Sequence, residues 1–188
     1  APLMRLLETI KSLSTSRSGQ LISTRDIVDI MNLIGVCVVA GNVRRTAEIV
    51  FGEADDEEYL DLKNYEKNPD RAAWGWTSNN SIFCQVGQDY YAPAQRTQIN
   101  GEPGYAWLKN MQEFGRMIDP PDYKDLLVLG GNPCLEQSLE PLELCDLVEN
   151  YLHRHRRLDS FKLSVRTSFL YAKTVMLLPM HWKESDEI

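Results

Sequence analysis

One short segment of the chain carries three side chains whose types suit redox and proton-transfer chemistry. Asn132, Cys134 and Glu136 alternate with Pro133 and Leu135 in a predicted loop. Asparagine supplies hydrogen-bond donors and an acceptor, cysteine supplies a redox-active sulfur, and glutamate supplies a general base. Because residues two apart in an extended backbone project to the same face, we expect the three side chains to face one ligand together.

The residues around this loop are suited to holding it in one conformation. Pro133 fixes its own φ angle and biases Asn132 away from helical geometry. Gly130 and Gly131 permit a tight turn or the close approach of another chain segment. A motif of five residues also fits an ordinary turn with a buried cysteine and a surface glutamate. The surrounding sequence has to decide between these two interpretations.

The cysteines are spaced for reactivity rather than for a structural framework. Cysteines lie at positions 37, 84, 134 and 145, a spacing that fits neither a zinc site nor a dense disulfide scaffold. Reduced thiols in a cytoplasmic setting fit better. Cys37 and Cys84 lie in apolar segments, and we expect both to be buried. The three histidines, His153, His155 and His181, are poorly spaced with the cysteines, so we predict no metal site.

The elements that must position the loop alternate between helix and strand. Apolar periodicity predicts helices at residues 3–13, 105–117 and 160–178, and a charged, exposed helix at residues 55–67. A further helix should begin after Ser23 or Thr24, with Asp26 in its first turn. Strands are predicted at residues 46–51, 82–86 and 126–129; residues 35–40 fit either helix end or strand, and residues 87–103 look like loop. The pattern indicates an α/β fold with a largely parallel sheet.

Bulk composition excludes some classes of partner. The chain has 188 residues, a net charge of -7 and 43% hydrophobic residues. An acidic chain argues against a nucleic-acid partner, because phosphate binding needs clustered basic residues. No apolar run reaches the length of a membrane span, and no signal peptide is visible at Ala1.

Several segments together resemble the ribonucleotide reductases, and most specifically the monomeric adenosylcobalamin-dependent enzymes. That family carries an Asn-x-Cys-x-Glu finger loop and a second cysteine a short distance later, as Cys134 and Cys145 do here. Further matching segments occur in the family's order at residues 39–48, 78–81, 100–104, 132–134 and 171–175. The resemblance covers nearly the whole chain, and the joint match is highly specific although no single piece is.

The resemblance implies a fold and a set of roles. The fold is a ten-stranded α/β barrel with the finger loop through its centre, and residues 1–188 would form part of it. Adenosylcobalamin would generate a thiyl radical on Cys134, which takes the 3′ hydrogen of the ribose. Glu136 would take the 3′-hydroxyl proton, Asn132 would hydrogen-bond the sugar, and Cys145 would be one of two cysteines that reduce the substrate and become a disulfide.

A second polar segment has two possible interpretations. The candidates for lining the substrate pocket are Ser78, Asn79, Asn80 and Ser81. An ordinary polar turn explains the same four residues nearly as well.

The implied partners are a ribonucleotide diphosphate or triphosphate, a dithiol reductant such as thioredoxin, and a deoxynucleotide effector in a longer parent chain. Some family features have no match here: the disulfide partner of Cys145, the C-terminal cysteine pair, the later phosphate-binding loop and any cobalamin-specific motif. The family's effector region would precede Ala1. We therefore expect an internal piece of a longer reductase that does not complete a turnover by itself.

Two alternatives remain open from the sequence. The chain could be a non-catalytic scaffold or interaction module derived from the same barrel. It could also come from a different radical or thiol enzyme that has a similar Asn-Pro-Cys loop and no need for cobalamin.

Overall fold

The computed structural model describes residues 1–114 and 120–186, in two compact units, Ala1–Ser138 and Leu139–Ile188. The first unit is built on a parallel three-stranded sheet in the order β1-β2-β3. Its strands are β1 (Glu48–Gly52), β2 (Ser78–Phe83) and β3 (Gly104–Ala106). The predicted α/β class with a parallel sheet is confirmed, whereas the ten-stranded barrel stays a prediction.

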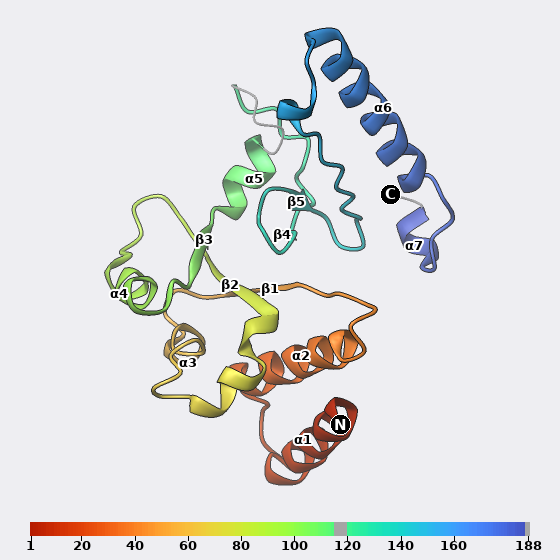
Figure 1. Ribbon diagram of the computed structural model, residues 1–188. Coiled ribbons are helices and arrows are strands. Elements are labelled where there is room, and N and C mark those ends of the chain that lie inside the picture. The colour runs from red at the N-terminus through yellow and green to blue at the C-terminus, as the bar shows by residue number, and fades with distance from the viewer. Residues whose placement is uncertain (115–119, 187–188) are drawn as a thin grey trace. The chain divides into compact units, whose positions relative to one another are not determined.

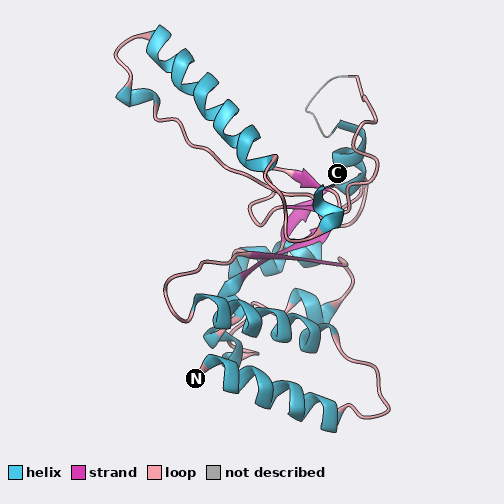
Figure 2. Cartoon of the chain, turned by 90° about the vertical axis from the view of Figure 1, so that its right-hand side faces the viewer, coloured by secondary structure: helices cyan, strands magenta, loops and turns pink. Residues whose placement is uncertain are grey.

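Helices α1 (Pro2–Ser16) and α2 (Thr24–Val39) pack along each other (Figure 2). Helix α2 begins where the sequence predicts, because Ser23 and Asp26 form a capping box. The hydroxyl of Ser23 accepts from the Asp26 amide, and the Asp26 carboxylate accepts from the Ser23 amide, both at 3.2 Å. The helix continues to Val39, so residues 35–40 are mainly helix end rather than strand.

The main core lies between the sheet and the helices α2 and α3 (Glu57–Leu60). Its buried residues are Val28, Tyr59, Leu60, Leu62, Ile82 and Cys84. The Tyr59 hydroxyl lies 2.7 Å from the carbonyl oxygens of both Val50 and Ser81, to which it donates, and so bridges β1 and β2. The prediction of an exposed helix at residues 55–67 is wrong. The helix in this charged stretch has only four residues, and Tyr59, Leu60 and Leu62 are buried in the core.

The prediction of a loop at residues 87–103 is also wrong, because helix α4 spans Tyr91–Asn100. Pro93 is tolerated in its first turn, where a missing amide hydrogen costs no helical bond. Gly101 ends the helix with φ at 78°, a left-handed cap that glycine favours. Helix α5 is described over Leu108–Phe114 and begins later than the predicted helix at 105–117, since β3 occupies the first residues of that range. The end of that predicted helix, from residue 115, lies outside the described residues.

A two-stranded hairpin of β4 (Gly130–Gly131) and β5 (Ser138–Leu139) lies at the end of the first unit, and Leu139 is the first residue of the second. Figures 1 and 2 show α1 and α2 on one side of the β1–β2 layer and the hairpin on the other. The prediction of a strand at residues 126–129 is wrong. Strand pairing begins only at Gly130, after these four residues. Of the four, Val128 is buried and the three leucines are exposed.

The second unit contains a 3-10 helix, η3 (Leu152–Arg154), a long helix α6 (Leu158–Met176) and a short helix α7 (Lys183–Asp186). The predicted helix at residues 160–178 is therefore confirmed. The side-chain oxygen of Asn150 accepts from Ser164 at 2.8 Å and from Ser168 at 3.1 Å, which holds the preceding segment against α6. None of the helices within residues 1–114 and 120–186 is long and apolar enough to cross a membrane.

Candidate functional site

The segment around Cys134 is a tight hairpin turn. The amide of Asn132 donates to the carbonyl of Gln137 at 3.1 Å, and the Gln137 amide donates to the side-chain Oδ1 of Asn132 at 3.1 Å. Across the turn, the amide of Leu135 donates to the Asn132 carbonyl at 2.9 Å. Three hydrogen bonds thus converge on Asn132 and place Pro133 and Cys134 at the turn.

This geometry corrects the expectation that three alternate side chains share one face. That expectation needs an extended backbone, whereas Leu135 has a positive φ of 60° and reverses the chain direction. Asn132 is buried, while Cys134 and Glu136 are exposed. The structure therefore brings Cys134 and Glu136 to the outside of one hydrogen-bonded turn, which the backbone carbonyl and the side-chain Oδ1 of Asn132 help to close.

Two contacts join this hairpin to the face of the sheet opposite α2. The side-chain amide Nδ2 of Asn79, on β2, donates to the carbonyl oxygen of Pro133 at 2.7 Å. On β4, Gly130 packs against the ring of Phe51, which is stacked on Phe83 with ring centroids 4.8 Å apart. The turn that carries Cys134 is thus held against the β1–β2 surface at Asn79 and Phe51.

The other residues of the polar segment on β2 are buried. Ser78, Asn80 and Ser81 are each less than 5% exposed, and only Asn79 is exposed among the four candidates for the substrate pocket. The hydroxyl of Ser78 donates to Oδ1 of Asn80 at 2.9 Å, and the Ser81 carbonyl accepts from Tyr59. Within the described part of the chain, Nδ2 of Asn80 has no hydrogen-bond partner. The segment is strand, so the polar-turn interpretation is wrong.

A lysine fixes the beginning of β2. The ammonium group of Lys63 donates to the carbonyl oxygens of Gly75 and Ser78, both at 2.6 Å, and lies 3.3 Å from the carboxylate of Glu102. Glu102 also accepts from the backbone amide of Asn80 at 3.1 Å. Burial lowers the pKa of Lys63, and the neighbouring Glu102 opposes that shift. The charged pair therefore orders the backbone from which the polar strand starts.

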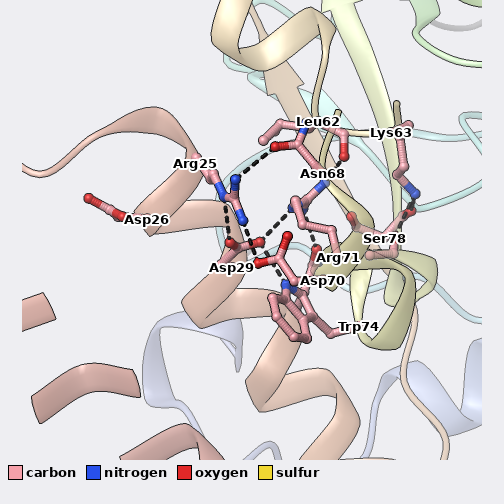
Figure 3. Close-up of polar contacts among 12 residues, drawn as sticks. Arg25, Asp26, Asp29, Leu62, Lys63, Asn68, Asp70, Arg71, Trp74 and Ser78 are labelled. Atoms are coloured by element: carbon pink, nitrogen blue, oxygen red, sulfur yellow. Dashed lines mark hydrogen bonds and ion pairs between the residues drawn. The ribbon is translucent and has the colours of Figure 1, made fainter. Parts of the chain in front are cut away.

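A buried polar network supports the two 3-10 helices, η1 (Pro69–Ala73) and η2 (Gly75–Thr77), that lead into β2 (Figure 3). Oδ1 of Asp29, on α2, accepts from Arg71 at 2.6 Å and from Trp74 at 2.7 Å. Arg71 also donates to the side chain of Asn32 at 3.1 Å, and Arg25 donates to the second Asp29 oxygen at 3.2 Å. The sequence-based prediction missed this network. In the sequence, the only local sign of the network is that charged residues lie close to tryptophans.

The cysteines fall into different environments. None of the four is in a disulfide; Cys134 and Cys145 are exposed, Cys84 is buried and Cys37 is half-buried. The prediction of burial is thus confirmed for Cys84 and is only partly met by Cys37. Cys134 lies in the first unit and Cys145 in the second. No cluster of three or more metal-ligating side chains occurs within residues 1–114 and 120–186.

Comparison with known proteins gives matches that span the whole of this chain and name one kind of enzyme. The chain is 59% identical over 187 residues to an adenosylcobalamin-dependent ribonucleoside-triphosphate reductase of Euglena gracilis, covering 100% of this chain and 26% of that protein. It is 50% identical over 188 residues to a probable enzyme of the same name from Dictyostelium discoideum, and 38% identical over 194 residues to the enzyme of Lacticaseibacillus paracasei. Both matches cover 100% of this chain and 25% of the relative.

The chain spans about a quarter of the length of the curated relatives it matches. No family model matches the chain, and no solved structure matches it. The resemblance that several segments of the sequence show together is nevertheless confirmed by these relatives: over its whole length, the chain is homologous to one segment of the adenosylcobalamin-dependent ribonucleoside-triphosphate reductases.

Proposed function

We propose that this chain supplies the thiol-bearing hairpin of an enzyme that reduces ribonucleotides to 2′-deoxyribonucleotides, with Cys134 as the residue that carries the thiyl radical. The observation that carries the proposal is the exposure of Cys134 on a turn closed by three hydrogen bonds at Asn132. The names of the relatives favour a ribonucleoside triphosphate as the substrate. An exposed thiol on a rigid turn can approach a sugar repeatedly in the same geometry, as hydrogen transfer requires.

In this proposal, Cys134 loses its thiol hydrogen and the resulting thiyl radical removes the 3′ hydrogen of the ribose. Glu136 accepts the 3′-hydroxyl proton as a general base. The 2′-hydroxyl leaves as water, two thiols supply two electrons and two protons and become a disulfide, and the hydrogen on Cys134 returns to C3′. Cys145 is one of these two thiols; its partner is not among the cysteines that we assign.

Asn132 contributes chiefly by holding the turn. Its Oδ1 accepts from the Gln137 amide, and the proposal also gives Asn132 a hydrogen bond to the sugar. The buried position of Asn132 means that a substitution there would disturb the turn as well as the substrate. The role of Asn132 is therefore harder to isolate by mutation than the roles of Cys134 and Glu136.

The relatives are named as adenosylcobalamin-dependent, and the same cofactor is proposed here. When bound, it supplies an oxidising radical by homolysis of its cobalt–carbon bond. The residues present fit that chemistry, because Cys134 is exposed and in no disulfide, so its S–H bond is accessible. No residue of this chain is assigned to hold the cofactor.

The proposed architecture is part of a ten-stranded barrel, with the hairpin on the inner face of its wall. A parallel sheet with helices on one face and the hairpin on the other supports this arrangement. The proposed partners are the ribonucleotide, a dithiol reductant of the thioredoxin type and a deoxynucleotide effector. The reductant is needed because each turnover consumes one pair of thiols.

The experiment that tests the proposal is ribonucleotide reduction by the full-length protein, with adenosylcobalamin and a dithiol present or omitted. Cys134→Ala should abolish product formation, whereas Cys37→Ala, at a half-buried cysteine on α2, should retain it. Undiminished reduction by Cys134→Ala would rule out the thiyl role. Absence of activity in the unmodified protein under every condition would favour a non-catalytic scaffold instead.

A further inference from the structure

The hydrogen bond between Asn79 and Pro133 has a direct geometric link to the proposed radical site. The peptide group whose carbonyl oxygen accepts from Asn79 joins Pro133 to Cys134, and it is planar and stiff. Fixing the carbonyl oxygen therefore fixes the orientation of the same peptide plane at the nitrogen of Cys134. From that nitrogen, the thiol sulfur is only three covalent bonds away.

The hairpin is rigid within itself, so its remaining freedom is movement as a body over the sheet. Its internal bonds link Asn132 with Leu135 and Gln137 and do not involve the sheet. The contact of Gly130 with Phe51 holds the base of the hairpin. Just before β4, Val128 is buried and its carbonyl accepts from Gln112 at 2.9 Å. Attachment at the base alone would still let the tip rock.

Asn79 provides an attachment close to the tip. It lies on β2, paired with Ile49 of the neighbouring strand, and so stands on a backbone that sheet bonds hold in place. Its side chain is exposed, so the bond to Pro133, at 2.7 Å, is not explained by burial of an amide that needs a partner. An exposed side chain that reaches across 54 residues of sequence to one backbone oxygen is suited to orient the segment that carries that oxygen.

We infer that Asn79 is a positioning residue for Cys134: its amide fixes the tip of the hairpin so that the thiol meets the ribose in one geometry. This inference rests on the proposed function of Cys134 and departs from the expectation that Asn79 lines the substrate pocket. A positioning residue acts on the reaction step and leaves substrate binding unchanged. Misplacement of a reacting group by about 1 Å can lower a rate by about a hundredfold.

The test compares Asn79→Asp with Asn79→Gln in the full-length protein. Aspartate keeps the shape of asparagine but its ionised carboxylate only accepts hydrogen bonds, so it cannot donate to Pro133. Glutamine retains the amide donor on a longer arm. We expect Asn79→Asp to lower kcat by about ten- to a hundredfold with KM unchanged, and Asn79→Gln to recover most of that loss.

A second measurement does not depend on activity. Amide hydrogen exchange, followed by mass spectrometry in the absence of cofactor, should become faster in residues 130–138 of Asn79→Asp, by up to about tenfold, the scale of one net hydrogen bond. Exchange elsewhere should be unchanged. Asn110→Asp makes the same chemical change at an exposed position on α5 and should alter neither exchange nor kinetics.

The outcomes separate this inference from the proposed function. A raised KM with kcat retained in Asn79→Asp would return Asn79 to substrate binding and overturn the inference. Unchanged exchange in the hairpin, or faster exchange throughout the chain, would also overturn it. If Cys134→Ala kept full activity, the proposed function would fail, while local loss of exchange protection in Asn79→Asp would still support the attachment of the hairpin.

Discussion

Asp29 and Arg71, which lie 42 residues apart in the sequence, form an ion pair in which Nε and Oδ1 are 2.6 Å apart and the arginine side chain is fully buried. The pair joins helix α2 to the 3-10 helices that lead into β2. Because β2 carries Asn79, the pair supports the strand on which the hairpin of Cys134 rests. Its contribution can be measured independently of any activity.

Asp29→Asn should lower the free energy of unfolding by about 3–5 kcal/mol, because it leaves the charge of Arg71 buried and uncompensated. Urea denaturation followed by far-ultraviolet circular dichroism measures the change. Replacing both residues, as Asp29→Leu with Arg71→Met, should recover part of the loss, since the buried charge of Arg71 is removed while the indole of Trp74 still loses its acceptor.

The control for this change is the ion pair of Arg157 and Asp159, whose side chains are 81% and 80% exposed. Asp159→Asn should leave the denaturation midpoint unchanged, because exposed pairs contribute little. Equal effects of Asp29→Asn and Asp159→Asn would contradict the role assigned to the buried pair.

The parts of the fold that were predictable from sequence depend on neighbouring residues. The capping box of Ser23 and Asp26 is a contact between residues three apart, so neighbouring residues determine where α2 begins. The apolar repeat of α6 is equally local. Alternating helix and strand signals then indicated a parallel sheet, because parallel strands need crossover connections.

The parts that were not predictable depend on distant residues. Tyr59 lies in a charged stretch, and its burial depends on distant residues, among them Val50 and Ser81, whose carbonyls accept from its hydroxyl. In the candidate site, the motif indicated a loop, and the structure has a hydrogen-bonded turn there. It could not indicate the turn at Leu135 or the bond from Asn79 to Pro133, because these depend on a positive φ angle and on a contact across 54 residues.

The contact of Gly130 with Phe51 gives a steric prediction. A β-carbon at position 130 would lie 2.7 Å from the Phe51 ring, which stacking on Phe83 prevents from moving away. Gly130→Ala should therefore destabilise the chain by about 1–3 kcal/mol. Thermal or urea unfolding measures this loss, and hydrogen exchange should show it concentrated in the hairpin.

Two variants check that the cause is this contact. A β-carbon at Gly41 would have no atom within 4 Å, so Gly41→Ala should not destabilise the chain. In a Phe51→Leu background the cost of Gly130→Ala should shrink, because the two residues are in contact and their effects are coupled. Purely additive effects would show that the ring of Phe51 is not what excludes the methyl group.

Glu48 gives a prediction for pH. Burial raises the pKa of Glu48 above its ordinary value of 4.5, and the hydrogen bond from Asn32, at 3.0 Å, partly opposes the shift. The folded state therefore keeps the proton to a higher pH than the unfolded state does. Stability from this residue is complete below pH 4.5 and is lost as pH rises through the folded pKa.

Glu48→Gln removes this dependence, because glutamine does not ionise. Subtracting the unfolding free energy of Glu48→Gln from that of the unmodified chain at each pH isolates the contribution of Glu48. The difference should become less favourable to the unmodified chain as pH rises above 4.5. A difference that stays constant or rises as pH increases above 4.5 would show that ionisation of Glu48 does not destabilise the folded state.

The cysteines should differ in their rates of alkylation, because the thiolate is the reactive form and a buried thiol is poorly accessible to the reagent. Cys134 and Cys145 are exposed and should react first. Cys84 is 4% exposed, and burial raises its pKa, so it should react last and respond most to raised pH. Mass spectrometry of peptides from the native chain, sampled over time with iodoacetamide, measures each rate. In the full-length protein, ribonucleotide reduction should be lost when Cys134 or Cys145 is alkylated, before Cys84 is alkylated. Activity that survives complete alkylation of Cys134 would refute the role proposed for that residue.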